Sequence, residues 1–355
     1  MKQKIIIAGA GLSGLLTGYR LKKVGFNVQI LEAGNRLGGR ISTILSAETP
    51  VEMGATWFGE QHVHLMGLIK ELNLPYFEQY MKGTAYFEAF SMAPPQPVEI
   101  PNDNLSYRIV GGTSTLIDKL ASYFDSDEIL LNQQIKELDF TKNIVSITTQ
   151  NRVFESDILI TTLPPALLIN SVMCKPSLPD EFIKIAQKTH TWMQDAVKIA
   201  VIYENPFWRN KSCSGTLFSN VGPINEFYDH CDFENTKFAL CGFVNGSYVS
   251  FSKEQRKQKV MDQLQKIYGN EALNYLSFEE KIWSEDNFIK SQKQDAVFIY
   301  PHQNNGHSVF SKVYFQNRLY VAGSETAAHF PGYMEGAVFS ATSIVSKIRN
   351  QFSNY

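Results

Sequence analysis

Three glycines near the start of the sequence have the spacing of a phosphate-binding turn. Gly9, Gly11 and Gly14 follow the pattern G-x-G-x-x-G. In such a turn the first glycine permits a tight bend, the second lets a pyrophosphate approach the backbone, and the third lets a helix pack closely on a strand. Glu32 lies downstream, where an acidic side chain can bind ribose hydroxyls. These residue types predict a site for the diphosphate and ribose of a dinucleotide.

The segments around these residues have the sequence patterns of a strand–helix–strand unit. Residues 4–8 are a β-branched apolar run that predicts a buried parallel strand, and residues 26–31 predict a second strand that leads to Glu32. Between them an amphipathic run to Val24 predicts a helix, which Gly25 can end. The N-terminus of this helix would present free N–H groups to a phosphate. A glycine-rich turn in an ordinary strand–helix–strand unit is the alternative, and the acid after the second strand favours the dinucleotide site.

A second loop after the acid extends the predicted phosphate site. Residues 36–40 have the pattern R-x-G-G-R. Gly38 and Gly39 can bring backbone close to a phosphate, and Arg40 can neutralise it, with a surface charge as the alternative for Arg40. A nicotinamide-dependent enzyme has no need of such a loop directly after its acid, so the motif narrows the choice of cofactor.

Another glycine motif occurs in the last forty residues. Residues 319–322 predict a strand that ends at Gly323, and a second glycine turn at residues 332–336 begins the final helix. The N-terminus of that helix can stabilise negative charge on a ligand. Residues 318–338 together form the most specific pattern in the chain.

These motifs resemble those of the FAD-dependent amine oxidase superfamily, which includes monoamine oxidases, polyamine oxidases, L-amino-acid oxidases and desaturase relatives. The resemblance spans nearly the whole chain and implies an α/β fold. In that fold a Rossmann-like FAD-binding domain of the glutathione-reductase type is interleaved with an α+β substrate domain. The implied FAD-binding domain comprises residues 1–57, 108–165 and 299–355, and the substrate domain comprises residues 58–107 and 166–298. Covalent members attach flavin near the C-terminal motif, where this chain has no cysteine, so FAD is expected to bind non-covalently.

The resemblance also assigns residues to the cofactor. Residues 51–58 resemble the segment whose backbone passes the flavin ring, with Gly54 and Ala55 at the closest approach and Trp57 beside it, although core packing explains Trp57 equally well. Ile135 occupies the position whose backbone pairs with adenine. The complete predicted set is Gly9, Gly11, Ser13, Gly14, Glu32, Arg40, Gly54, Ala55, Thr56, Trp57, Ile135, Gly323, Ser324, Glu325, Tyr333 and Met334.

Lys198 is the first candidate catalytic residue. It begins a predicted strand and lies ten residues before Trp208. This segment resembles the amine oxidase strand whose lysine holds a water at flavin N5, where the lysine can orient water and assist the reaction of reduced flavin with oxygen. An edge-strand lysine that keeps the sheet soluble is the alternative.

Tyr333 is the second candidate, because it matches the family tyrosine that forms one wall of an aromatic cage before the flavin. Tyr300, Phe298 and Trp57 are candidates for the opposite wall. A cage orients an amine between two aromatic faces, with its α-carbon toward flavin N5. The implied reaction oxidises the CH–NH group to an imine by hydride transfer, and O2 then reoxidises the flavin and gives H2O2.

Two other functions remain open: a desaturase or porphyrinogen-oxidase-like enzyme that uses the same FAD motifs, and a non-catalytic flavoprotein. Lys198 and Tyr333 favour the amine oxidase. Residues 58–107 form a shorter segment than in the animal enzymes, which implies a more open pocket.

Composition excludes several other classes of function. The 355 residues carry a net charge of −2 and are 44% hydrophobic, which permits a large core and implies no general affinity for nucleic acid or anionic membranes. The four cysteines lack metal-binding spacing and are expected to be reduced, mostly buried thiols. His62 and His64 could bind a metal, but solvated histidines at a helix end are the commoner case.

The expected location is the cytoplasm, because no signal peptide precedes the first strand and no apolar run has transmembrane length. Residues 344–355 are polar, unlike the membrane anchor of mitochondrial monoamine oxidases. The expected partners are a small-molecule amine and O2, with no nucleic acid or membrane.

Several local predictions concern the rest of the chain. Thr113 is expected to cap a helix through its hydroxyl. Residues 129–140 are expected to pair with residues 144–149, and residues 153–162 are expected to form one further strand. Residues 252–268 predict a helix that Gly269 can end.

Overall fold

A five-stranded parallel sheet holds the first glycine turn. The computed structural model describes residues 3–100, 105–289 and 301–352. Across the sheet the strands are β10 (Ile129–Leu130), β2 (Asn27–Leu31), β1 (Lys4–Ala8), β14 (Ile158–Thr161) and β21 (Leu319–Val321). All of the neighbouring strands run parallel. Ile5, Ile6 and Ile7 are fully buried, as the apolar run predicts for a strand that is covered on both faces.

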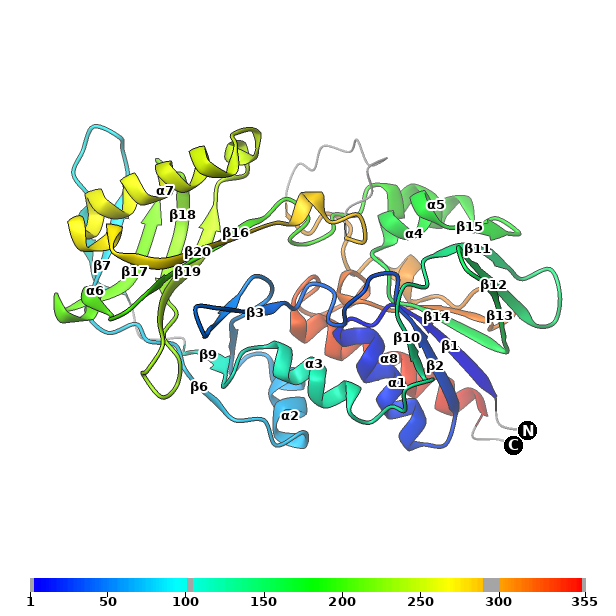
Figure 1. Cartoon of the computed structure of the whole chain (residues 1–355). Helices are drawn as coiled ribbons and strands as arrows, with labels where there is room; N and C mark the ends of the chain where they lie inside the picture. The colour runs from blue at the N-terminus through cyan, green and yellow to red at the C-terminus, as the bar shows by residue number, and fades with distance from the viewer. Residues whose placement is uncertain (1–2, 101–104, 290–300, 353–355) are drawn as a thin grey trace.

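Alternate residues of β1 point to two different cores. Ile5 and Ile7 pack against α1 (Leu12–Lys23), α3 (Ser114–Ala121) and α8 (Met334–Phe352). Ile6 and Ala8 belong to the core on the opposite face. Two helices and a second sheet cover that face: α4 (Pro165–Ser171), α5 (Asp180–Gln187), β13 (Val153–Ser156), β12 (Val145–Thr149), β11 (Ile135–Asp139) and β15 (Met173–Lys175). These layers form the right half of Figure 1.

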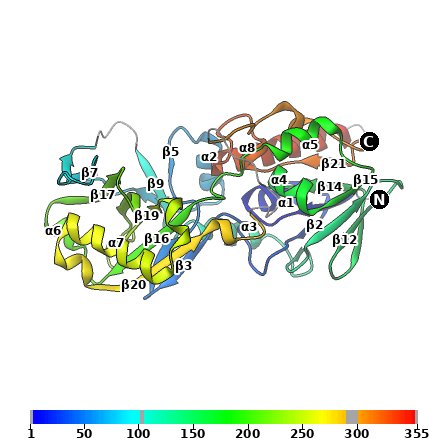
Figure 2. The ribbon, with the colours of Figure 1, turned by 90° about the horizontal axis from the view of Figure 1, so that it is seen from above.

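A seven-stranded sheet forms the other half of the molecule (Figures 1 and 2). Its order is β20 (Tyr275–Ile282), β16 (Val197–Tyr203), β19 (Phe238–Val244), β18 (Ile224–Asp229), β17 (Cys213–Ser219), β7 (Thr84–Glu88) and β8 (Gln96–Val98). Helix α7 (Lys253–Tyr268) covers one face with an apolar core. Ser252 and Gln255 form a reciprocal capping box at its start, and Gly269, with φ of +90°, ends it as predicted.

Shorter elements lie between the two halves: β3 (Thr43–Ser46), β4 (Thr49–Glu52), β5 (Phe58–Gly59), α2 (Val63–Glu71), β6 (Tyr76–Glu78) and β9 (Ser106–Ile109). Helix α6 (Phe207–Asn210) joins β16 to β17 within the second half. Five short 3-10 helices complete the described chain: η1 (Gly246–Ser250), η2 (Asn270–Leu273), η3 (Trp283–Glu285), η4 (Ser308–Ser311) and η5 (Ser324–Thr326). Within the described residues no helix has both the length and the apolar character needed to cross a bilayer.

Three local predictions are wrong. Residues 153–162 form two strands in different sheets, which meet at Asp157, whose carboxylate accepts a hydrogen bond from Lys4 N. Residues 129–140 are likewise divided: β11 pairs with β12 as predicted, whereas β10 pairs with β2 in the parallel sheet. The Thr113 hydroxyl caps nothing among the described residues; its backbone N–H instead donates to the buried carboxylate of Glu52.

The strand that carries Lys198 lies inside its sheet. β16 pairs with β19 on one side and with β20 on the other. Every residue of β16 is buried, Lys198 included. The alternative of an exposed lysine on a sheet edge is therefore wrong. The observed architecture is of the predicted α/β class, and the proposed division into two interleaved domains stays a prediction.

Candidate active site

One long cavity joins the two halves of the molecule. It has a volume of about 940 Å³ and runs from the glycine turn after β1 to the face of the seven-stranded sheet that carries Lys198. Of the residues predicted from the sequence, all except Gly14 and Glu325 line it, and Lys198 and Tyr333 lie on the same cavity. Residues widely separated in the sequence are thus brought to one site.

The glycine turn leaves room and hydrogen-bond donors on the cavity side. Gly9 has φ of +103°, which favours glycine. A Cβ on Gly14 would lie 1.9 Å from Gly9 O, so Gly14 serves the packing of α1 on β1 and does not line the cavity. A Cβ on Gly11 would meet only Gly38 O, at 3.8 Å. Ser13 also lines the cavity, and its buried hydroxyl has no hydrogen-bond partner in the described parts of the chain. Open helix-end donors and an unpartnered hydroxyl fit a phosphate.

Glu32 is held rigidly beside this turn. Its two carboxylate oxygens accept hydrogen bonds from Ala10 N and Gly34 N, each at 2.8 Å. The acid is therefore fixed at the edge of the cavity, after β2, where the sequence places a ribose-binding group.

The two arginines of the R-x-G-G-R loop have structural partners that the sequence does not reveal. Arg36 donates to the carbonyl oxygens of Leu37, Gly39 and Ile41 and so holds the loop in shape. Arg40 forms a two-pronged ion pair with Glu325. Glu325 is 1% exposed and does not line the cavity. The structure therefore assigns it to this ion pair and not to the predicted contact with the cofactor. Arg40 does line the cavity, and its role toward a phosphate stays a prediction.

We expect Arg40→Gln to destabilise the protein by about 3–5 kcal/mol, because it leaves the buried Glu325 charge unpaired. Burial opposes ionisation of Glu325, but the charge of Arg40 and its hydrogen bonds hold the pKa of this carboxyl below its ordinary value. A carboxyl with a lowered folded-state pKa stabilises the fold above its ordinary pKa, and this contribution is lost as the pH falls through the lowered value. Urea unfolding between neutral and acidic pH measures both effects. The double variant Arg40→Gln/Glu325→Gln should recover much of the loss, and equal destabilisation of both variants would contradict the assignment.

Lys198 lies on the floor of the cavity without a counter-ion. Its ammonium donates to Gly54 O at 2.6 Å and to the Thr56 hydroxyl. It also lies 4.7 Å from the centre of the Trp57 ring. No carboxylate of the described residues forms an ion pair with Lys198, and burial lowers its pKa. An ammonium has three donors, so one remains for a water or ligand in the cavity.

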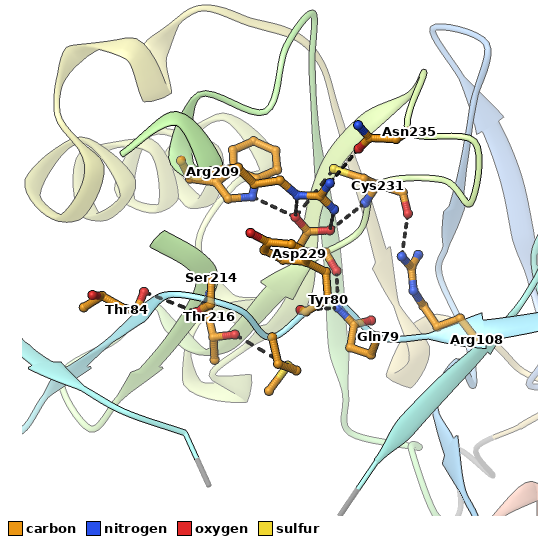
Figure 3. A network of polar contacts seen from close by, with 12 residues as sticks. Gln79, Tyr80, Thr84, Arg108, Arg209, Ser214, Thr216, Asp229, Cys231 and Asn235 are labelled. Carbon is orange, nitrogen blue, oxygen red and sulfur yellow. Dashed lines mark hydrogen bonds and ion pairs between the residues drawn. The ribbon is translucent and has the colours of Figure 1, made fainter. Parts of the chain in front are cut away.

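Trp57 is fixed by a chain of polar contacts that reaches the protein surface. Its indole N–H donates to Gln79 Oε1 at 2.9 Å, and Gln79 Nε2 donates to the Asp229 carbonyl at 2.7 Å. The Asp229 carboxylate is in turn paired with Arg209 (Figure 3). Gln79, which the sequence does not single out, thus holds one wall of the cavity.

The rings that contact Tyr333 are ones that the sequence did not single out, and the pairing of Tyr333 with Trp57 as walls of a cage stays a prediction. The Trp57 ring contacts Tyr228, at 4.9 Å between ring centres, and no contact with Tyr333 is among the ring pairs of the described residues. Tyr333 instead lies 5.7 Å from the Trp192 ring and 5.4 Å from the His302 ring. Trp192 lies in a loop without a motif, so no pattern singled it out. The other two candidates for the cage, Phe298 and Tyr300, lie outside the described residues.

The histidines and cysteines have partners or positions away from the cavity chemistry proposed from the sequence. His62 accepts from Gly59 N, and His64 N donates to the buried Glu335 of α8. In the part of the chain that the structure describes, no group of three potential ligands could hold a metal. All four cysteines are free, and none lines the cavity. The prediction of reduced, mostly buried thiols is confirmed.

The comparisons with known proteins agree with this geometry. The profile of the family "Flavin containing amine oxidoreductase" matches residues 12–93 and 92–348. The chain is 23% identical to the "Probable flavin-containing monoamine oxidase A" of Dictyostelium discoideum, over 99% of this chain and 98% of the relative. It is 24% identical to the flavin-containing amine oxidase B of Sus scrofa, over 95% of this chain and 84% of the relative.

Solved structures show the same fold. Cyclohexylamine oxidase from Brevibacterium oxydans superposes with a TM-score of 0.87 at 17% identity, with 99% of this chain and 100% of the other covered. A putrescine oxidase bound to putrescine superposes with a TM-score of 0.85 at 18% identity, with 99% of each chain covered. With the family profile matched along most of its length, the chain belongs to the flavin-containing amine oxidoreductase family and is an FAD-dependent enzyme of that class.

Proposed function

We propose that the cavity binds FAD without a covalent bond and that the enzyme oxidises the CH–NH group of a small amine to an imine. One observation carries the proposal most directly: the buried Lys198 lies on the same cavity as the open glycine turn and the unpartnered Ser13 hydroxyl. The residues therefore fit FAD at one end and a reacting group at the other. The absence of all four cysteines from the cavity lining supports non-covalent binding.

When bound, FAD supplies the acceptor for the hydride of the amine α-carbon and passes the electrons to O2, which becomes H2O2. The chain supplies position and electrostatics. The rings of Tyr333 and Trp57, which both line the cavity, orient the amine, and Gln79 prevents Trp57 from turning away. Lys198 holds a water with its remaining donor.

The proposal is tested by mixing the purified yellow protein with a panel of amines without oxygen. We expect at least one amine to bleach the flavin absorption, and air to restore it with release of H2O2. Bound FAD that no amine bleaches would overturn the proposal and would favour the desaturase-like or non-catalytic function. Release of the flavin on acid precipitation would confirm non-covalent binding, and flavin that stays with the pellet would contradict it.

A further inference from the structure

A single row of side chains crosses the cavity face of the seven-stranded sheet. The strand register places one residue of each of five adjacent strands in this row, which we call the floor row: Phe218, Glu226, Phe243, Lys198 and Lys281. All five line the cavity. The opposite face of the sheet is apolar and packs on α7, so the charges of the row are directed away from the core.

Only some of the charged side chains in the floor row have a counter-ion among the described residues. Lys281 is paired with Asp286 at 3.1 Å. Glu226 accepts a hydrogen bond from the Tyr228 hydroxyl at 3.1 Å, but no cation of the described residues forms an ion pair with it. The row thus presents a carboxylate without a counter-ion to a cavity that we propose to bind amines.

Aromatic rings surround this carboxylate. Phe218 and Phe243 flank Glu226 in the row, and Tyr228 lies on the same strand and the same face. The Tyr228 ring contacts Phe218, at 5.9 Å between ring centres. Aromatic faces attract cations, and desolvation by the rings strengthens the attraction of a carboxylate for an ammonium. The surroundings of Glu226 therefore suit an organic cation.

The floor row has a positive charge at one strand and a negative charge two strands away. Glu226 and Lys198 are two strands apart, about 10 Å at the spacing of neighbouring strands, with Phe243 between them. Lys198 disfavours a cation in its vicinity, whereas Glu226 attracts one. A molecule with two amino groups would therefore lie with a charged end at Glu226 and with the other end, toward Lys198, free to lose its proton.

We propose that Glu226 binds a second, non-reacting cationic group of the substrate, so that the preferred substrates are diamines or other amines with a distal cation. This proposal rests on the proposed oxidation of amines in the same cavity. It assigns the specificity of the enzyme to one side chain two strands away from Lys198 on the same sheet face.

The test compares straight-chain α,ω-diamines with the monoamines of the same chain length. For Glu226→Gln, which keeps an acceptor for the Tyr228 hydroxyl, we expect kcat/KM for the preferred diamine to fall about 10–100-fold, since a hydrogen bond to a charged group is lost. The monoamine should change less than about threefold, within the scatter of neutral substitutions. Glu279→Gln is the matched control, because Glu279 lies on the same sheet face outside the cavity and bonds to Ser46.

A binding measurement separates this proposal from the proposed function. An α,ω-diguanidinoalkane carries two cations and no oxidisable amine, so it does not reduce the flavin. Its binding can therefore be followed as a change in the absorption spectrum of the oxidised flavin. We expect Glu226→Gln to weaken it at least about tenfold and to leave the monoguanidino compound unchanged. Equal affinity in the two proteins, or no preference for diamines in the wild type, would overturn the proposal even if monoamines are oxidised. If Glu226→Gln does not fold, Glu226→Asp is the second variant, because it keeps the charge on a shorter side chain. The Glu226→Asp enzyme should prefer a longer diamine than the wild type does. An unshifted preference would contradict the assignment.

Discussion

Replacing Gly11 with alanine is expected to weaken FAD binding in a protein that remains folded. The backbone of Gly11 has φ of −76°, which any residue adopts, and its new Cβ would meet no described protein atom closer than 3.8 Å. The methyl group would instead occupy the space that the pyrophosphate needs. Overpacking of this kind costs about 1–3 kcal/mol, so FAD affinity should fall about 10–100-fold. Titration of the apoprotein with FAD, followed by flavin fluorescence, measures the loss.

Two other glycines serve as controls for this experiment. Gly14→Ala should prevent folding, because its Cβ would lie 1.9 Å from Gly9 O. Gly67→Ala in α2 should be tolerated, since nothing lies within 4 Å of its Cβ, and alanine stabilises a helix interior by about 0.5–1 kcal/mol. If Gly11→Ala binds FAD as tightly as the wild type, the diphosphate does not lie where the glycine pattern places it.

Lys198→Met should slow the reoxidation of reduced flavin by about a hundredfold or more, with little change in FAD affinity. Loss of a positioned group that handles protons and water costs about 10²–10⁴ in rate, and the Lys198 ammonium is the fully buried cation at this point of the cavity. Stopped-flow mixing of the reduced enzyme with oxygenated buffer measures the rate directly. An unchanged rate would remove the assigned role.

The same variant has a pH signature in its stability. Burial lowers the pKa of Lys198 from its ordinary value of 10.5, so the folded protein binds fewer protons at this site than the unfolded chain. Stability of the wild type relative to Lys198→Met should therefore rise as the pH increases toward 10.5. Thermal melts across the alkaline range test the sign, and they also show whether the methionine variant is folded.

Local motifs of the sequence were sufficient to predict β1, α1, β2 and α7, because apolar periodicity, caps and glycines act within a few residues. They were not sufficient where contacts between residues far apart in the sequence determine the structure. At the division between β13 and β14, Asp157 accepts a hydrogen bond from the backbone N–H of Lys4. Such a contact leaves no local signal, since Asp157 has an ordinary surface-type side chain and a backbone N–H is present in every residue but proline.

The same limit applies to the site. The glycine motifs led to residues that line the cavity, because the spacing of glycines is visible in the sequence. The ion pair of Arg40 with Glu325, the support of Trp57 by Gln79 and the neighbourhood of Tyr333 and Trp192 follow only from the three-dimensional arrangement. Glu226 was missed for a related reason. Its place beside Lys198 depends on strand register across β19, and alternation within one strand carries no information about register between strands.

The order in which the parts of the site are synthesised affects the folding of the enzyme. β1 and α1 leave the ribosome before β21 and α8, which complete the same sheet and helix layer. Until β21 has emerged β14 keeps an unpaired edge, and until the start of α8 has emerged the pocket is incomplete. Contacts of such sequence separation form slowly, and a ligand that binds only the native state stabilises it by mass action. Cellular supply of flavin therefore bears on how much newly made protein survives, as well as on its catalytic rate.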